Sequence, residues 1–265
     1  MADVFEGKSC VVTGGTSGIG FAVAEALLKR GAFVSAVGYP QESVDAASEK
    51  FAAYENARCS LVNVTEWEAV KAMVDEAVTT CGRLDYLFNN AGVGATAPYD
   101  KIEMKHWKMI VDLNLWGVIY GVHAAFPVMA EQGSGHIVNT SSIAGLLPVP
   151  YQALYCATKF AVAGMTEALR YENEYRGIAF STVCPANVAT AIFGDAPPPP
   201  DAISAEEAAE AILAGVERKD GIIVFPDEVR ENWRRLWADQ TLMDGEMRRL
   251  AEERRTAYET GGNYY

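Results

Sequence analysis

The feature that most constrains the fold is a glycine-rich turn between two apolar runs near the amino terminus. The turn reads TGGTSGIG at 13–20, follows the apolar run SCVV, and leads into FAVAEALLKR, which ends at Gly31. A second apolar run, AFVSAVG, occupies 32–38. Short apolar runs bounded by glycine indicate buried strands, and the segment between them indicates a helix. The chain therefore opens with a strand, a helix and a second strand, the repeating unit of a parallel sheet.

The same alternation continues along the chain. Further strands are predicted at 59–64, 85–92 (with its exit loop), 135–142, 178–185 and 221–226. Further helices are predicted at 43–56, 65–82, 105–133, 151–175 and 205–216, with a helical tail at about 227–260. The pattern predicts an α/β fold with about seven parallel strands and helices on both faces of the sheet. No internal repeat or linker is evident, so one domain over 1–265 is expected.

Two local signals refine the second half of the chain. Pro197 to Pro200 stand in a row, so the stretch 191–204 is predicted to be a long surface loop rather than a helix. Ser204 and Glu207 have the spacing of a capping box and predict the start of the next helix.

Charge and cysteine content exclude several classes of protein. The chain has 265 residues, with 22 basic against 35 acidic side chains and a formal charge of −13. Such a surface repels phosphate backbones, so nucleic acid is not predicted as a partner. The five cysteines are odd in number and form no C-x-x-C pair, and the three histidines have no ligand-like spacing. Neither a disulfide framework nor a metal site is predicted, and a reducing cytoplasm fits best.

Membrane and export signals are not predicted either. The start, MADVFEGKSC, contains Asp3 and Glu6 and has no long apolar run. The apolar stretch 143–165 contains Pro148 and Lys159 among other breaks, which argues against a membrane span.

Three residues in the middle of the chain suggest a chemistry. Tyr155 and Lys159 are one helical turn apart, so their side chains point the same way, and Ser142 follows the predicted strand before them. A serine, a tyrosine and a lysine held together can polarise a carbonyl, protonate it and lower the tyrosine's pKa, which is ordinarily ~10. This is the equipment for hydride transfer to or from a secondary alcohol. Tyr-x-x-x-Lys is common by itself. It is informative here because the chain also contains TGGTSGIG at 13–20 and NNAG at 89–92.

With these motifs together, the chain resembles the short-chain dehydrogenase/reductase family from about Lys8 to Thr190. The matching motifs, in order, are TGGTSGIG at 13–20, NNAG at 89–92, Asn114, NTSSIAG around Ser142, YCATK at 155–159 and PANVAT at 185–190. The resemblance implies a Rossmann-like, doubly wound sheet, a nicotinamide cofactor and oxidoreduction of alcohols and carbonyls.

The resemblance also implies roles for single residues. Tyr155 would be the general acid or base, Lys159 would lower its pKa and reach the cofactor ribose, Ser142 would bind the substrate oxygen, and Asn114 would hold a water of the proton relay. The implied cofactor-binding residues are Gly14, Thr16, Ser17, Gly18, Ile19, Gly20, Gly38, Tyr39, Asn63, Val64, Asn90, Ala91, Gly92, Tyr155, Lys159, Pro185, Val188 and Thr190. The glycines follow T-G-x-x-x-G-x-G, which departs from G-x-G-x-x-G, and Ala186 stands where the family usually has glycine.

The end of the second predicted strand bears on the choice between NAD and NADP. An acid there binds the ribose 2′-hydroxyl, whereas a base accommodates a 2′-phosphate. This chain has Gly38 and Tyr39 at that place, Ser17 where phosphate-binding members carry a cation, and Asn63 where aspartate is frequent. NAD is therefore preferred, with NADP left open.

The predicted substrate is a small hydrophobic carbonyl or alcohol. The expected apolar walls are Val93, Ile143, Leu146, Leu147, Val149, Tyr151, Ile192 and Phe193. TGGTSGIGFA and VSAVGYPQESVDAA resemble the matching stretch of bacterial bile-acid 3α-hydroxysteroid dehydrogenases. A hydroxysteroid is thus one expectation, a 3-oxoacyl or aryl-ketone reductase is the alternative, and a nucleotide-sensing regulator is the non-enzymatic one. The segment 191–204 is the expected substrate loop, and the tail could cap the cleft, mediate assembly or lie on a membrane.

Assembly is expected as well. Ala153, Ala157, Ala161, Gly164 and Ala168 form a stripe of small residues at helical spacing. Such a stripe permits close helix packing, in the core or across a subunit interface. In the short-chain dehydrogenase/reductase family, which the chain resembles, this helix and the preceding long one pack against a second subunit. The resemblance therefore implies a homodimer or homotetramer.

Overall fold

A computed structural model describes residues 3–194 and 197–261. Within them, seven parallel strands form one sheet in the order β3-β2-β1-β4-β5-β6-β7, which confirms the predicted fold class. The strands are β1 (Ser9–Thr13), β2 (Phe33–Gly38), β3 (Ala57–Leu61), β4 (Tyr86–Asn89), β5 (Gly135–Thr140), β6 (Ile178–Pro185) and β7 (Ile222–Phe225). The chain winds outward from β1 to β3 and then returns to build the other half from β4 to β7.

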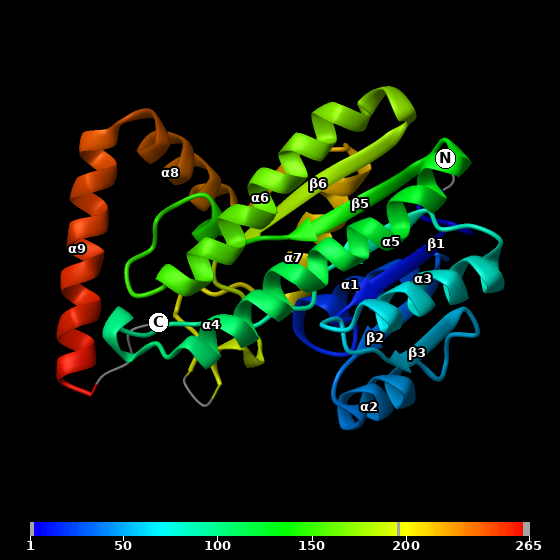
Figure 1. Ribbon diagram of the computed structural model, residues 1–265, viewed down its shortest axis with the longest axis horizontal. Helices are drawn as coiled ribbons and strands as arrows, with labels where there is room; N and C mark the ends of the chain where they lie inside the picture. The colour runs from blue at the N-terminus through cyan, green and yellow to red at the C-terminus, as the bar shows by residue number, and fades with distance from the viewer. Residues whose placement is uncertain (1–2, 195–196, 262–265) are drawn as a thin grey trace.

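Helices cover both faces of this sheet, as Figure 1 shows. One layer contains α1 (Gly18–Lys29), α2 (Gln41–Phe51) and α7 (Ala205–Glu217), and the other contains α3 (Trp67–Cys81), α5 (Gly117–Gln132) and α6 (Ala153–Asn173). Neighbouring strand residues face opposite layers because side chains alternate along a strand. Val12 and Phe88 lie in the core under α1, while Val11 and Leu87 lie in the core under α3 and α5.

The predicted helix at 105–133 forms as one helix with a change of winding inside it. It consists of α4 (Met104–Val111), a π-helical turn at Asp112–Trp116, and α5. A π turn contains one residue more than an α turn and is frequent at functional sites. Met104–Gln132 is also long and apolar enough to cross a membrane by length and composition, a test that core helices pass as well. In this fold α5 packs against α3, β4 and β5.

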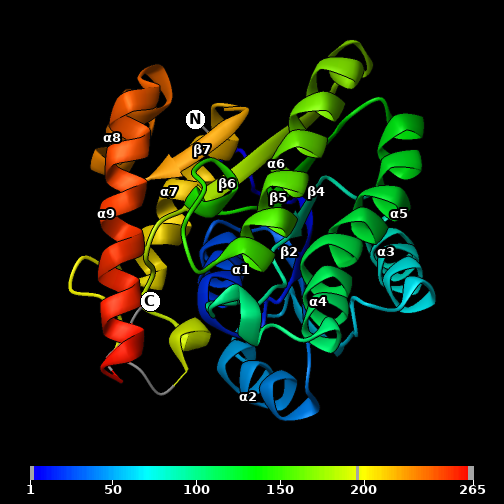
Figure 2. The same ribbon diagram turned by 60° about the vertical axis from the view of Figure 1, so that its left-hand side comes forward.

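The carboxyl-terminal tail forms two helices beside the β7 edge of the sheet (Figure 2). These are α8 (Asp227–Ala238) and α9 (Gln240–Glu259). They are anchored where Leu236 and Met243 pack on Leu147, all three buried. Residues 1–2, 195–196 and 262–265 lie outside the described residues, so the expected substrate loop at 191–204 is described except for 195–196.

Candidate active site

The glycine turn after β1 lies where the strand order reverses. β1 pairs with β2 on one side and β4 on the other, and ligands of open α/β sheets bind at the carboxyl ends of such strands. Gly14 and Gly18 have φ values of 63° and 52°, a conformation that side chains disfavour. A Cβ at Gly14 would lie 3.0 Å from the Cα of Ala91, and one at Gly20 would overlap the carbonyl oxygen of Gly14. The turn therefore holds bare backbone against the loop after β4.

The amino end of α1 completes a cradle for an anion. Thr13 ties the two loops together, since its hydroxyl accepts from the backbone N–H of Asn90 (3.0 Å) and Ala91 (3.1 Å). α1 begins after Ser17, whose side chain caps none of the first-turn N–H groups. Such N–H groups lack intrahelical acceptors and attract a phosphate. A cavity of about 330 Å³ opens here, so the residues present fit a pyrophosphate-bearing cofactor.

The predicted Ser142, Tyr155 and Lys159 come from the end of β5 and from α6, and Tyr155 and Lys159 line this cavity. Ser142 follows β5 and starts a short turn, in which its Oγ accepts from the backbone N–H of Ala144 at 3.1 Å. Tyr155 and Lys159 lie one turn apart in α6, and the Lys159 Nζ is 5.5 Å from the centroid of the Tyr155 ring. The same Nζ donates to the carbonyl oxygen of Thr140 at 2.9 Å. All three predicted residues are buried.

Burial shifts the pKa values of the tyrosine and the lysine in opposite directions. Burial raises the pKa of Tyr155 to about 12, and a hydrogen bond with Ser142 opposes this more weakly. Burial also lowers the pKa of Lys159 to about 8. The expected fall in the pKa of Tyr155 is thus not seen in the apolar setting of α6. At neutral pH the phenol holds its proton, and the lysine is still mainly charged.

Asn114 lies in the π turn and is fully buried. Its Oδ1 accepts from the backbone N–H of Val93 at 2.9 Å, and its Nδ2 donates to the carbonyl oxygen of Val93 at 2.8 Å. A Cβ at Gly92 would lie 3.0 Å from this Oδ1 and 3.5 Å from the Lys159 Nζ. The side chain thus fixes the loop after β4 beside Lys159. Both ends of this side-chain amide are thus hydrogen-bonded to the backbone of Val93.

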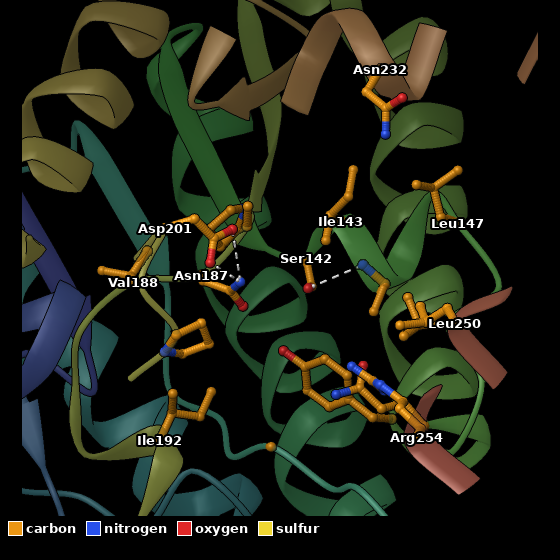
Figure 3. Close-up of a pocket in the computed structure, with 18 of the residues that line it drawn as sticks. Ser142, Ile143, Leu147, Asn187, Val188, Ile192, Asp201, Asn232, Leu250 and Arg254 are labelled. Atoms are coloured by element: carbon orange, nitrogen blue, oxygen red, sulfur yellow. Dashed lines mark hydrogen bonds between the residues drawn. The ribbon is translucent and has the colours of Figure 1, made fainter. Parts of the chain in front are cut away.

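A second, larger cavity of about 630 Å³ opens on Ser142 and Tyr155 (Figure 3). Five of the expected apolar wall residues line it, namely Ile143, Leu147, Val149, Ile192 and Phe193. Three do not: Val93 lines the smaller cavity, Leu146 packs in a core cluster with Ala163, Cys184 and Val224, and Tyr151 lines neither. Leu146 was a wrong expectation because its side chain faces β6 and β7 rather than the cleft.

The two cavities adjoin, and Tyr155 borders both of them. Lys159 borders only the smaller cavity, with the glycine turn, and Ser142 borders only the larger one. The phenol therefore stands between the cofactor cradle and the larger cavity.

Comparison with known proteins identifies the family. The sequence profile of the short chain dehydrogenase family matches residues 8–200. The chain is a short-chain dehydrogenase. It is therefore an oxidoreductase that interconverts alcohols and ketones with a nicotinamide cofactor.

Individual relatives agree with the family. The chain is 37% identical over 188 residues to a 3alpha-hydroxysteroid dehydrogenase of Mediterraneibacter gnavus, covering 70% of this chain and 75% of that protein. It is 33% identical over 197 residues to a cyclohexanol dehydrogenase of Acinetobacter sp., covering 74% and 78%. A crystal structure of a short-chain dehydrogenase/reductase from Burkholderia phymatum in complex with NAD superposes with a TM-score of 0.80 at 26% identity, covering 98% and 97%.

In this dehydrogenase the end of β2 has no room for an acid. A Cβ at Gly38 would overlap the hydroxyl oxygen of Thr16, which itself lies 3.0 Å from the Oγ of Ser43. Thr16 is buried, whereas the next residue, Tyr39, is 67% exposed. The hydroxyl groups of Thr16 and Ser43 thus lie at the end of β2, where an acid would bind a ribose 2′-hydroxyl and a base a 2′-phosphate.

The remaining predicted cofactor residues divide into two sets. Those lining the smaller cavity are Gly14, Ser17, Gly18, Ile19, Asn90, Ala91, Gly92, Tyr155, Lys159, Pro185 and Thr190. Those away from it are Thr16, Gly20, Gly38, Tyr39, Asn63, Val64 and Val188. Asn63 is occupied locally, since its Oδ1 accepts from the backbone N–H and hydroxyl of Thr65 and its Nδ2 donates to Glu66. Val188 lines the larger cavity, and Val64 is buried against Gly117.

The sequence left capping of the cleft by the tail as one of several expectations, without naming the residues, and the tail does form one wall of the larger cavity. That wall is a single face of α9 made by Glu246, Met247, Arg249, Leu250, Glu253 and Arg254. Spacings of three and four residues in this list signal one helical face, but they do not say what the face covers. The packing of Leu236 and Met243 on Leu147 places it over the cavity.

Proposed function

We propose that this short-chain dehydrogenase interconverts a hydrophobic secondary alcohol and its ketone, with the substrate in the larger cavity. The observation that carries the proposal is the position of Tyr155 on the boundary of both cavities. A proton donor there can reach a substrate oxygen while the reacting carbon faces the cofactor cradle.

Each residue of the site then has a task. Ser142 binds the substrate oxygen and orients it toward Tyr155. Tyr155 gives a proton to that oxygen during reduction and takes one during oxidation. Lys159, whose ammonium is held by the Thr140 carbonyl at 2.9 Å, stabilises the phenolate as it forms. The nicotinamide cofactor supplies or accepts the hydride.

We propose NAD as the preferred cofactor. The cations between Thr13 and Glu42 are Lys29 and Arg30, and both are in ion pairs: Lys29 with Glu25, and Arg30 with Glu210 and Glu217. Neither is available for a 2′-phosphate. The hydroxyls of Thr16 and Ser43 suit a ribose hydroxyl better than a dianion.

We propose a hydroxysteroid or a similarly sized alicyclic alcohol as the substrate. A volume of about 630 Å³ with apolar walls at Ile143, Leu147 and Ile192 suits a ligand of that size. The relatives named for 3alpha-hydroxysteroid and cyclohexanol oxidation point the same way.

A matched substrate panel tests both proposals. Purified protein would be assayed with NADH and with NADPH against steroid ketones, cyclohexanones, aryl ketones and 3-oxoacyl thioesters. We expect the highest kcat/KM for steroid or alicyclic ketones, with NADH at least about tenfold better than NADPH. Preference for thioesters or aryl ketones would contradict the substrate class. A strong preference for NADPH would contradict the cofactor assignment. Cofactor binding without turnover on any class would favour a regulator.

A further inference from the structure

The wall that α9 contributes to the larger cavity contains a half-buried arginine. Figure 3 shows Arg254 reaching from α9 into the cavity beneath Leu250, with Ser142 on a facing wall. Its Nη1 donates to the carbonyl oxygen of Pro150 at 2.7 Å, which fixes the guanidinium at this wall. Its Nε–H is buried and has no hydrogen-bond acceptor among the residues that the structure describes.

Arg254 differs from the other half-buried arginines in the described residues. Arg30, Arg170 and Arg230 each pair with a carboxylate, at 2.7, 2.9 and 2.9 Å. No carboxylate among the described residues lies within ion-pair distance of Arg254, although the chain carries a charge of −13. Burial lowers its pKa, yet an arginine remains charged at any physiological pH. A half-buried charge without a carboxylate partner costs stability, which points to a functional use.

The acids around the cavity do not supply the missing partner. Glu246 and Glu253 both bind Arg249, and Asp201 accepts from the side-chain amide of Asn187. These three carboxylates are thus engaged elsewhere along the wall. Among the described residues that line the cavity, Arg249 has carboxylate partners, whereas the guanidinium of Arg254 has none.

We propose that Arg254 binds a carboxylate of the substrate, so that the preferred substrates are hydrophobic alcohols or ketones bearing an acid group. This rests on the proposed function of the cavity and deepens it. The planar guanidinium suits a carboxylate, which it can bind through two parallel hydrogen bonds. One cation without a carboxylate partner, bordered by engaged carboxylates, suits a monoanion better than a phosphate dianion. Arg254 lies beyond residues 8–200, which the family profile matches.

Charge-matched pairs of ligands test this most directly. We would use 3-oxo-cholanoate and its methyl ester, and acetylbenzoate and its methyl ester. For each pair, kcat/KM is measured with reduced cofactor. The dissociation constant is measured by calorimetry with NAD⁺-loaded protein, in which a ketone cannot be reduced. The readout is the ratio of acid to ester, because the ester reports general damage to the cavity.

The variants are Arg254→Gln, Arg254→Lys and Arg255→Gln. Arg255 is the matched control because it is 56% exposed and pairs with Glu252 on the outer side of the same helix. We expect wild type to prefer the acid and Arg254→Gln to lose roughly ten- to hundredfold of that preference. Arg254→Lys should keep part of the preference for the acid over the ester, and Arg255→Gln should keep all of it.

Two outcomes would overturn the proposal: a wild type that does not prefer the acid, or a preference that survives in Arg254→Gln. The two arms also separate this proposal from the proposed function. Turnover of ketones without a charge preference would remove the role of Arg254 alone. Arginine-dependent binding of acids without turnover would remove the proposed function alone.

Discussion

Tyr155 and Lys159 lie in one buried site, yet pH affects them in different ranges. The pKa of Lys159 is lowered to about 8 and that of Tyr155 is raised to about 12, both chiefly by burial. The lysine therefore loses its charge as pH rises through about 8, while the phenol keeps its proton. We expect kcat/KM for ketone reduction to be level below about pH 7 and to fall as pH rises through about 8. A reduction rate that climbs steadily from pH 7 to 10 would contradict this assignment.

His136 gives a second prediction at the residue scale, concerning stability. Its pKa is lowered to about 3 by burial and by Lys219, and its Nε2 lies 2.8 Å from the Oγ of Ser181, which donates to the carbonyl oxygen of Asp220. In the unfolded chain the histidine has a pKa of ~6.5. Between that pH and about pH 3 it is therefore protonated in the unfolded chain and neutral in the folded chain. This histidine's contribution to stability is thus complete above pH 6.5 and is lost as pH falls toward 3.

Denaturant unfolding at several pH values measures that contribution. The histidine should make the free energy of unfolding fall by up to roughly 1.4 kcal/mol per pH unit below pH 6. In His136→Gln the fall with decreasing pH should be shallower, because the new side chain does not titrate. Identical slopes for the two proteins would show that His136 does not carry this effect.

At the scale of elements, two glycines in helices predict opposite effects of the same substitution. In α1, a Cβ at Gly20 would overlap the carbonyl oxygen of Gly14 and lie 2.5 Å from the Nδ2 of Asn90. In α6, a Cβ at Gly164 would meet nothing within 4 Å. Gly20→Ala should destabilise the fold by about 1–3 kcal/mol and weaken NADH binding at least about tenfold. Gly164→Ala should stabilise it by about 0.5–1 kcal/mol.

Thermal unfolding and fluorescence titration with NADH measure the two effects. Wild-type binding in Gly20→Ala would show that the glycine turn does not form the cradle. A loss of stability in Gly164→Ala would show that this face of α6 is packed against another surface.

The elements that periodicity specifies were predicted from the sequence, and those set by tertiary packing were not. Apolar strand runs and the glycine turn gave the seven-stranded parallel sheet, and Ser204 and Glu207 form the predicted capping box. The π turn at Asp112–Trp116 was missed, because it arises where Asn114 hydrogen-bonds to both backbone groups of Val93. No local pattern encodes contacts with a loop so far away along the chain.

The candidate site divides in the same way. Ser142, Tyr155 and Lys159 were predicted from spacing and come together in the structure. The role of Arg254 was not predicted, because an arginine on an amphipathic helix looks the same whether it faces solvent or a cavity. Gly38 was read as a missing acid, whereas the structure shows that Thr16 fills the space any side chain there would need.

At the scale of the whole molecule, the hairpin of α8 and α9 closes the larger cavity but not the cradle. Leu236 is 2% exposed and packs with Leu147 and Met243. Leu236→Ala should destabilise the fold by about 2–4 kcal/mol and loosen α9. Because α9 lines only the larger cavity, KM for the ketone should rise while the affinity for NADH is unchanged.

Leu242→Ala is the control for the loosening of α9 expected in Leu236→Ala. Leu242 is on α9 and is 43% exposed, so its truncation should change stability by less than about 0.5 kcal/mol. Equal losses of cofactor and ketone affinity in Leu236→Ala would show that α9 does not act on the larger cavity alone.

The central claim is that Tyr155, which borders both cavities, transfers the proton to and from the substrate oxygen. The most direct measurement is ketone reduction by wild type and Tyr155→Phe, together with NADH binding to both proteins. We expect the variant to bind NADH as wild type does and to lose at least about a thousandfold in kcat, because phenylalanine keeps the ring and lacks the proton. Turnover within about tenfold of wild type, at unchanged NADH affinity, would contradict the account.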